Sequence, residues 1–235
     1  MNKWKGRSKG TILGYRIFVW CIKNIGIRSS YFVLYFVATY YFIFEKKSNQ
    51  YISYYFKNRL NFSALKTKLS VFRSYFVFGK VLIDKTAISV GLRNRFTYEF
   101  DGIENIKNLL AEKKGGVLIS AHIGNFEIAE HFFADIDFDA QINLVTTDQE
   151  VTAIREYMES ISVKKSNIKF IFVKDDMSHI FRINEALSNT ELICFTGDRY
   201  FEGSKFMEAD LLGKTAKFPA GPFLIASRLR VPVVY

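Results

Sequence analysis

The stretch Gly116–Glu127, which reads Gly-Val-Leu-Ile-Ser-Ala-His-Ile-Gly-Asn-Phe-Glu, indicates the fold class of this chain. It begins with an apolar run that is typical of a buried parallel strand. Two small or polar residues then turn the chain, and Asn125 is a suitable N-cap for a following helix. A strand that leads through a polar turn into a helix is the repeating unit of α/β proteins. His122 is therefore expected in a turn at the carboxyl end of a strand.

His122 and Glu127 form a candidate acid–base pair. An imidazole can remove a proton from a hydroxyl, and a carboxylate can fix the tautomer and stabilise the imidazolium. Five residues span roughly 500° of helix, so we expect His122 in the turn and Glu127 in the first turn of the helix. The spacing alone is weak in a chain with 3 His and 23 acidic residues. Its position supports it, because α/β proteins bind ligands beyond the carboxyl ends of strands.

The alternation of strands and helices continues to the end of the sequence, and it predicts an α/β fold with a mainly parallel sheet flanked by helices. Strands are expected at 96–100, 116–121, 142–147, 168–173, 191–196, 215–218 and 231–235, and helices at 103–113, 125–134, 149–160, 178–188 and 220–229.

An N-terminal, membrane-associated helical region is expected before the α/β part. Residues 11–22 are mainly apolar, with Arg16 as their charged residue, and Tyr31–Phe44 runs for 14 residues without a charge. A spanning helix needs about 20 apolar residues, so crossing the bilayer and lying in it both stay open, and a buried core helix is the alternative. We assign 1–50 to a membrane-anchoring segment. The catalytic domain is then 51–235, with amphipathic helices in a lead-in at 51–95 and the α/β part at 96–235.

The charge is distributed unevenly. Residues 1–100 carry 18 Lys and Arg against 3 Asp and Glu, whereas residues 101–235 carry 15 against 20. A solvated basic surface and nucleic-acid binding are possible readings. The basic half also holds the long aromatic and apolar runs, which favours an anionic membrane surface over nucleic acid. An acidic carrier protein could use the same patch.

Two later segments add candidate binding residues. Asp198 and Arg199 follow the apolar strand expected at 191–196, and a guanidinium suits a phosphate or a phosphopantetheine. Gly221 begins an expected helix whose backbone N–H groups favour an anion. Cys21 and Cys194 lie far apart in apolar contexts, which indicates buried thiols in a reducing compartment, and no metal site is predicted.

With these segments in order, residues 100–235 resemble the late acyltransferases of lipid A biosynthesis, the lauroyl/myristoyl transferase branch of the lysophospholipid acyltransferase superfamily. The resemblance rests on 115–127, on Gly197-Asp198-Arg199 and on 218–222 (Phe-Pro-Ala-Gly-Pro). The basic and apolar N-terminal segment is similar to that family's membrane anchor.

The resemblance implies transfer of a fatty acyl group from acyl carrier protein to a hydroxyl of a membrane glycolipid, at the cytoplasmic face of the inner membrane. His122 would be the general base and Glu127 would orient it, while Asn125, Asp198, Arg199 and Gly221 would bind substrate. No cofactor is implied beyond the phosphopantetheine of the donor. Family members usually continue beyond the Val-Pro-Val strand, so truncation at the C-terminus is expected. A different lipid acceptor (glycerolipid, aminolipid or polyene) and an inactive membrane or carrier-protein binding module are the alternatives.

Overall fold

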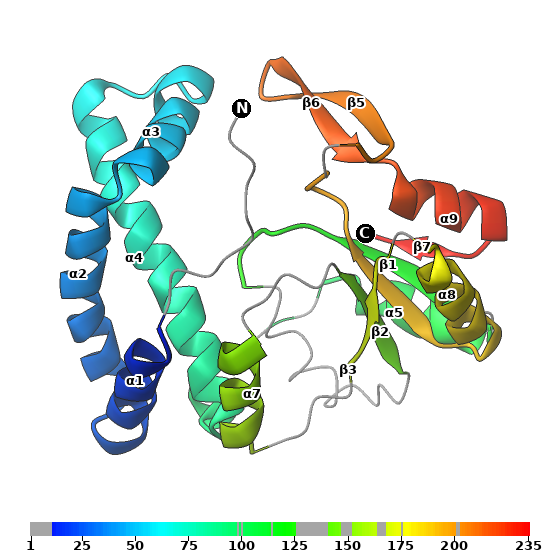
Figure 1. The fold of residues 1–235 in the computed structure, drawn as a ribbon, viewed down its shortest axis with the longest axis horizontal. Helices are drawn as coiled ribbons and strands as arrows, with labels where there is room; N and C mark the ends of the chain where they lie inside the picture. The colour runs from blue at the N-terminus through cyan, green and yellow to red at the C-terminus, as the bar shows by residue number, and fades with distance from the viewer. Residues whose placement is uncertain are drawn as a thin grey trace.

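The computed structural model describes residues 11–97, 99, 101–113, 115–125, 141–146, 152–163, 168–174, 176–200 and 203–235. They form a helical region, which comes first in the chain, and an α/β region beside it (Figure 1).

A five-stranded sheet forms the centre of the α/β region, in the order β3-β2-β4-β1-β7, and every neighbouring pair is parallel. The strands are β1 (Gly116–Ser120), β2 (Ile142–Thr146), β3 (Ile168–Phe172), β4 (Leu192–Thr196) and β7 (Val233–Val234). The helices of this region are α5 (Ile103–Ala111), α7 (Thr152–Ile161), α8 (Ser178–Ser188) and α9 (Gly221–Leu229). The predicted α/β fold with a mainly parallel sheet is confirmed.

The sheet is buried on both faces because its strands are apolar almost throughout. Val117, Leu192 and Ile193 are fully buried, and Ile183 of α8 packs in the same core as Val117 and Ile193. A parallel strand covered by helices has no solvent face to leave polar, which explains why these strands lack the alternation of an amphipathic strand.

The helical region has a core of its own. Its elements are α1 (Ile12–Asn24), α2 (Ile27–Phe44), α3 (Lys46–Tyr54), the π-helical turn η1 (Tyr55–Arg59), α4 (Ala64–Ser89) and the 3-10 turn η2 (Arg93–Arg95). Ile22, Leu34 and Ala87 bury their side chains where α1, α2 and α4 meet. Tyr157 and Ile161 of α7 pack against this cluster, so α7, which lies between β2 and β3 in the chain, packs on the helical region.

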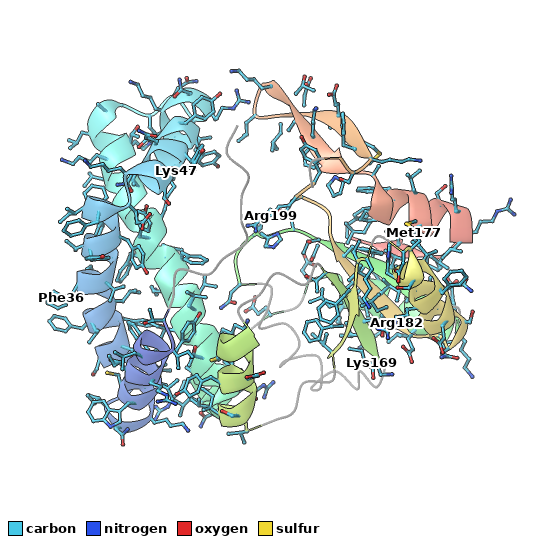
Figure 2. The ribbon with its side chains drawn as sticks, viewed as in Figure 1. Phe36, Lys47, Lys169, Met177, Arg182 and Arg199 are labelled. Carbon is cyan, nitrogen blue, oxygen red and sulfur yellow. The ribbon has the colours of Figure 1, made fainter. Side chains whose placement is uncertain are left out.

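Within the described residues, α2 is the one helix long and apolar enough to cross a membrane. Only a small part of it is buried, and its aromatic side chains on the outer face are exposed. Phe36 points away from the rest of the protein (Figure 2). A core helix of a soluble protein would instead be mostly buried, so the exposed apolar face favours contact with lipid.

The structure corrects two expectations. Phe96, Thr97 and Glu99 are not in a strand, because Phe96 packs against the helical core instead of pairing with the sheet. The expected strand at 215–218 belongs to an antiparallel hairpin, β5 (Phe206–Leu211) with β6 (Lys214–Pro219), which forms a separate two-stranded sheet. β5 was missed because Glu208 and Asp210 interrupt its apolar pattern. The helix expected at 125–134 lies outside the described residues, apart from Asn125.

Candidate active site

The register of β1 and β4 places His122 opposite Asp198. Ser120 pairs with Thr196 as the last residue of each strand, and His122 and Asp198 each follow two residues later. Adjacent parallel strands that end in register bring equivalent following residues together at the carboxyl edge of the sheet. Asp198, which the sequence offered as a candidate binding residue, therefore lies beside His122.

Both carboxylate oxygens of Asp198 contact His122. The imidazole Nδ1 lies 2.9 Å from Oδ1, and the backbone N–H of His122 donates to Oδ2 at 3.2 Å. The two side chains are 30% and 29% exposed, so the pair is partly buried and still reaches the surface. Nδ1 is the ring nitrogen that contacts Asp198, so proton transfer to or from a substrate would use Nε2.

The environment keeps Asp198 ionised. Partial burial works to raise its pKa, but the hydrogen bonds from the imidazole and backbone N–H of His122, together with the charge of the imidazolium form, outweigh burial. The pKa of Asp198 is therefore held below its usual value. An ionised carboxylate on Nδ1 fixes the tautomer with the proton on Nδ1, which is the one whose Nε2 can act as a base.

Gly197 allows the two strand ends to approach. Its N–H donates to the carbonyl of Ser120 at 2.8 Å, and a Cβ at this position would lie 2.7 Å from Cγ2 of Ile119. Ile119 is buried in the core of the sheet and cannot swing into solvent. A glycine is thus needed directly before Asp198.

Gly197→Ala is expected to lower the free energy of unfolding by about 1–3 kcal/mol, the usual cost of over-packing a core, and to move Asp198 away from His122. Chemical denaturation measures the first effect and the kcat for acyl transfer measures the second. Gly221→Ala is the matched control for stability, because no atom lies within 4 Å of its added Cβ. Equal stability of the two variants would show that the contact with Ile119 is not tight.

The strands beside His122 offer no activated nucleophile. Ser120 on β1 donates its hydroxyl to the carbonyl of Phe195 at 3.4 Å. Cys194 on β4 is largely buried, and burial raises the pKa of its thiol despite the hydrogen bond with Ser120. A protonated thiol and a hydroxyl directed at a backbone carbonyl are both poor nucleophiles.

The other predicted site residues are placed differently. Glu127 lies outside the described residues. The side-chain amide of Asn125 donates to the carbonyl of Val81 in α4 at 3.3 Å, which ties the turn after β1 to the helical region. Arg199 lies at the carboxyl end of the sheet (Figure 2), and Gly221 is the first residue of α9, on a separate segment. Substrate binding by these residues stays a prediction.

The contact between His122 and Asp198 was not paired from the sequence, which assigned the orienting role to Glu127, and that assignment stays a prediction because Glu127 lies outside the described residues. A signal was present: His122 and Asp198 each stand two residues after a strand of the same length. Knowing that β1 and β4 are neighbours would have been enough to pair them. In the described part of the chain, no group of three or more His, Cys, Asp and Glu side chains is placed to hold a metal ion.

The family model for bacterial lipid A biosynthesis acyltransferases matches residues 74–234, which is more than half of the chain and includes every element of the site. The chain belongs to this family. No curated protein sequence matches it. As a member of the lipid A biosynthesis acyltransferase family, the protein is a lipid acyltransferase. The region that matches the family model begins within α4, so part of the helical region belongs to the family domain.

Proposed function

We propose that this acyltransferase moves a fatty acyl group from acyl carrier protein to a hydroxyl of a lipid A-type glycolipid, with His122 as the general base. The observation that supports the chemistry is the contact of both Asp198 oxygens with His122. The family membership supports the class of acceptor.

In this mechanism, Nε2 of His122 takes the proton of the acceptor hydroxyl as its oxygen attacks the thioester carbonyl of the donor. Asp198 stabilises the imidazolium that forms, through its charge and its contact with Nδ1. The tetrahedral intermediate then expels the phosphopantetheine sulfur, and the imidazolium returns the proton to that sulfur. The products are the ester of the glycolipid and the free thiol of the carrier protein.

Direct transfer is favoured over a covalent acyl-enzyme. A covalent route would need an activated side-chain nucleophile within hydrogen-bond reach of His122. Ser120 and Cys194, the serine and the cysteine of the two strands that lead into the site, are engaged or buried. The acceptor hydroxyl then serves as the nucleophile itself.

We place the enzyme at the cytoplasmic face of the inner membrane, where an acidic carrier protein and a membrane glycolipid can meet. The exposed apolar face of α2 supports membrane attachment. The excess of Lys and Arg in residues 1–100 supports binding to an anionic lipid surface.

Arg199 is the proposed contact for a phosphate of the donor or the acceptor. Arg199→Ala should raise the KM for one substrate by roughly 10- to 150-fold, the usual effect of losing a charge-assisted hydrogen bond, with a smaller change in kcat. Arg182→Ala is the matched control, because Arg182 is an exposed arginine on α8. Unchanged kinetics of Arg199→Ala would remove Arg199 from the binding site. The substrate whose KM rises identifies the phosphate.

Mass spectrometry of membrane lipids tests the function as a whole. Cells that express the wild-type protein should contain a glycolipid that is heavier by one acyl group than the glycolipid of cells that lack it. Cells that express His122→Ala should resemble cells without the protein. A new acyl group on a glycerolipid or another lipid class would contradict the proposed acceptor and leave the chemistry intact.

A further inference from the structure

The tip of the β5–β6 hairpin carries apolar side chains where a soluble protein would carry polar ones. Leu211 pairs with Lys214, and Leu212 and Gly213 form the two-residue turn between them, with φ of 51° and 72°. Two central residues with positive φ belong to the type I′ turn, which favours Asn or Asp before Gly. Leucine is disfavoured in this conformation, and Leu211 and Leu212 are 50% and 47% exposed.

One face of the hairpin is apolar except for Lys214, the partner of Leu211 at the tip. Cross-strand pairs place Met207 with Phe218 and Ala209 with Ala216 on the face that includes Leu211, while Glu208 and Lys217 pair on the opposite face. All of β5 is exposed, while Ala216 and Phe218 on β6 are half-buried, so the described residues cover this face only in part. An isolated two-stranded hairpin is only marginally stable in water, and contact with an apolar phase would stabilise it.

The tip is held against the helical region. Nη2 of Arg59 donates to the carbonyls of Leu211 and Leu212, at 2.8 and 2.5 Å. Nζ of Lys214 donates to the hydroxyl of Tyr54 at 3.3 Å. The hairpin thus reaches the segment between α3 and α4 on the same side of the molecule (Figure 1).

Exposed aromatic and apolar side chains are carried by the elements that meet here, and we call this set the interfacial edge. Its members come from α3, η1, the start of α4 and the hairpin tip, and they are Tyr51, Tyr54, Tyr55, Leu65, Leu211 and Leu212. Residues 51–69 and 205–217, which contain this edge, carry seven Lys and Arg against two acidic residues. Tyrosine beside leucine and a surplus of cations is the composition of a surface that lies at the boundary of an anionic bilayer.

We propose that the interfacial edge docks on an anionic phospholipid surface, with Leu211 and Leu212 inserted among the acyl chains. This contact is additional to the attachment through α2, and it does not depend on which lipid is acylated. The start of the hairpin contacts a residue next to the site. Tyr200 follows Asp198 by two residues, and its ring packs against the ring of Phe206 in β5, with ring centroids 5.6 Å apart. Docking of the edge would thereby fix the orientation of the segment that carries Asp198 and Arg199 relative to the membrane.

A fluorescent label on Leu212→Cys of the full-length protein tests the proposal. The protein is reconstituted with vesicles of phosphatidylglycerol and phosphatidylcholine, and quenching by nitroxide-labelled lipid is compared with quenching by aqueous iodide. A label on Phe181→Cys is the matched control, because Phe181 is 78% exposed on α8. The unsubstituted protein, whose two cysteines are largely buried, is labelled in parallel as the background.

We expect the nitroxide lipid to quench the label at position 212 and iodide to quench the label at 181. Lys214→Gln should raise the vesicle concentration for half-maximal quenching at 212 by roughly fivefold, the effect of one cation near an anionic surface. Quenching of the 212 label by iodide alone would overturn the proposal. A response of that label to acidic carrier protein but not to vesicles would overturn it as well and assign the edge to the carrier protein.

The variant Leu212→Asn separates docking from folding. Asparagine suits the first central position of a type I′ turn, so the hairpin should remain folded. A label on Leu211→Cys in this background should lose most of its quenching by nitroxide lipid. Unchanged quenching at 211 would show that Leu212 does not insert.

Discussion

His122→Ala is expected to lower the kcat for acyl transfer by about 10²–10⁴-fold, to the limit of detection. The alanine leaves the acceptor hydroxyl without a base, and the nearby Ser120 and Cys194 cannot replace it for the reasons of geometry and burial given above. Because the imidazole is partly exposed, its removal should leave no large cavity and little loss of stability. Steady-state kinetics with acyl carrier protein as donor give the rate, and thermal unfolding shows whether the variant is folded.

His179→Gln is the matched control for His122→Ala. His179 is buried on α8, and its Nδ1 accepts the backbone N–H of Lys174 at 3.3 Å, so its role is structural. This variant should lower the melting temperature and keep the kcat of the folded enzyme. Near-normal activity of purified His122→Ala would refute the proposed mechanism.

The sequence predicted the sheet well because its strands are buried. Short apolar runs such as Val117–Ile119 and Leu192–Phe195 have no other stable place in an α/β protein, and the polar turns around them mark their ends. α8 was predicted with its observed bounds, 178–188, because its amphipathic stretch is the segment that separates the apolar strands β3 and β4 in the chain. The hairpin was predicted only in part, since neither face of β5 is buried in protein and burial is what creates a recognisable pattern.

The sequence named His122 and Asp198 as candidate site residues, but it did not predict that the two side chains contact each other. His122 was identified by local pattern, because the strand and turn that position it are contiguous in the sequence. The contact with Asp198 depends on β1 and β4 being neighbours, and 76 residues separate the two side chains. Strand order follows from how whole layers pack, which a local pattern does not contain. The contact of Arg59 with the hairpin tip depends on tertiary packing in the same way.

Asp198→Asn is expected to lower kcat by about 10²–10⁴-fold, with a smaller change in KM, because it disables the base. The carboxylate receives two donors, Nδ1–H and the backbone N–H of His122. An asparagine has one oxygen, so its NH₂ group must face one of those donors. When it faces the ring, it favours the tautomer with the proton on Nε2, which cannot act as a base. In either orientation the imidazolium loses the charge that stabilises it.

Three comparisons show whether Asp198 acts through His122. Asp176→Asn makes the same chemical change at the same end of the sheet, where Asp176 accepts the N–H of Ser178 at 2.9 Å, and it should leave kcat unchanged. The double variant of His122→Ala and Asp198→Asn should be no slower than His122→Ala alone, because residues that act as a unit are not additive. Glu127→Gln measures how much kcat depends on Glu127, the carboxylate that the sequence analysis assigned to orienting His122. A large loss with Glu127→Gln and none with Asp198→Asn would return the orienting role to Glu127. The reverse result would assign that role to Asp198, whose carboxylate contacts Nδ1 and the backbone N–H of His122.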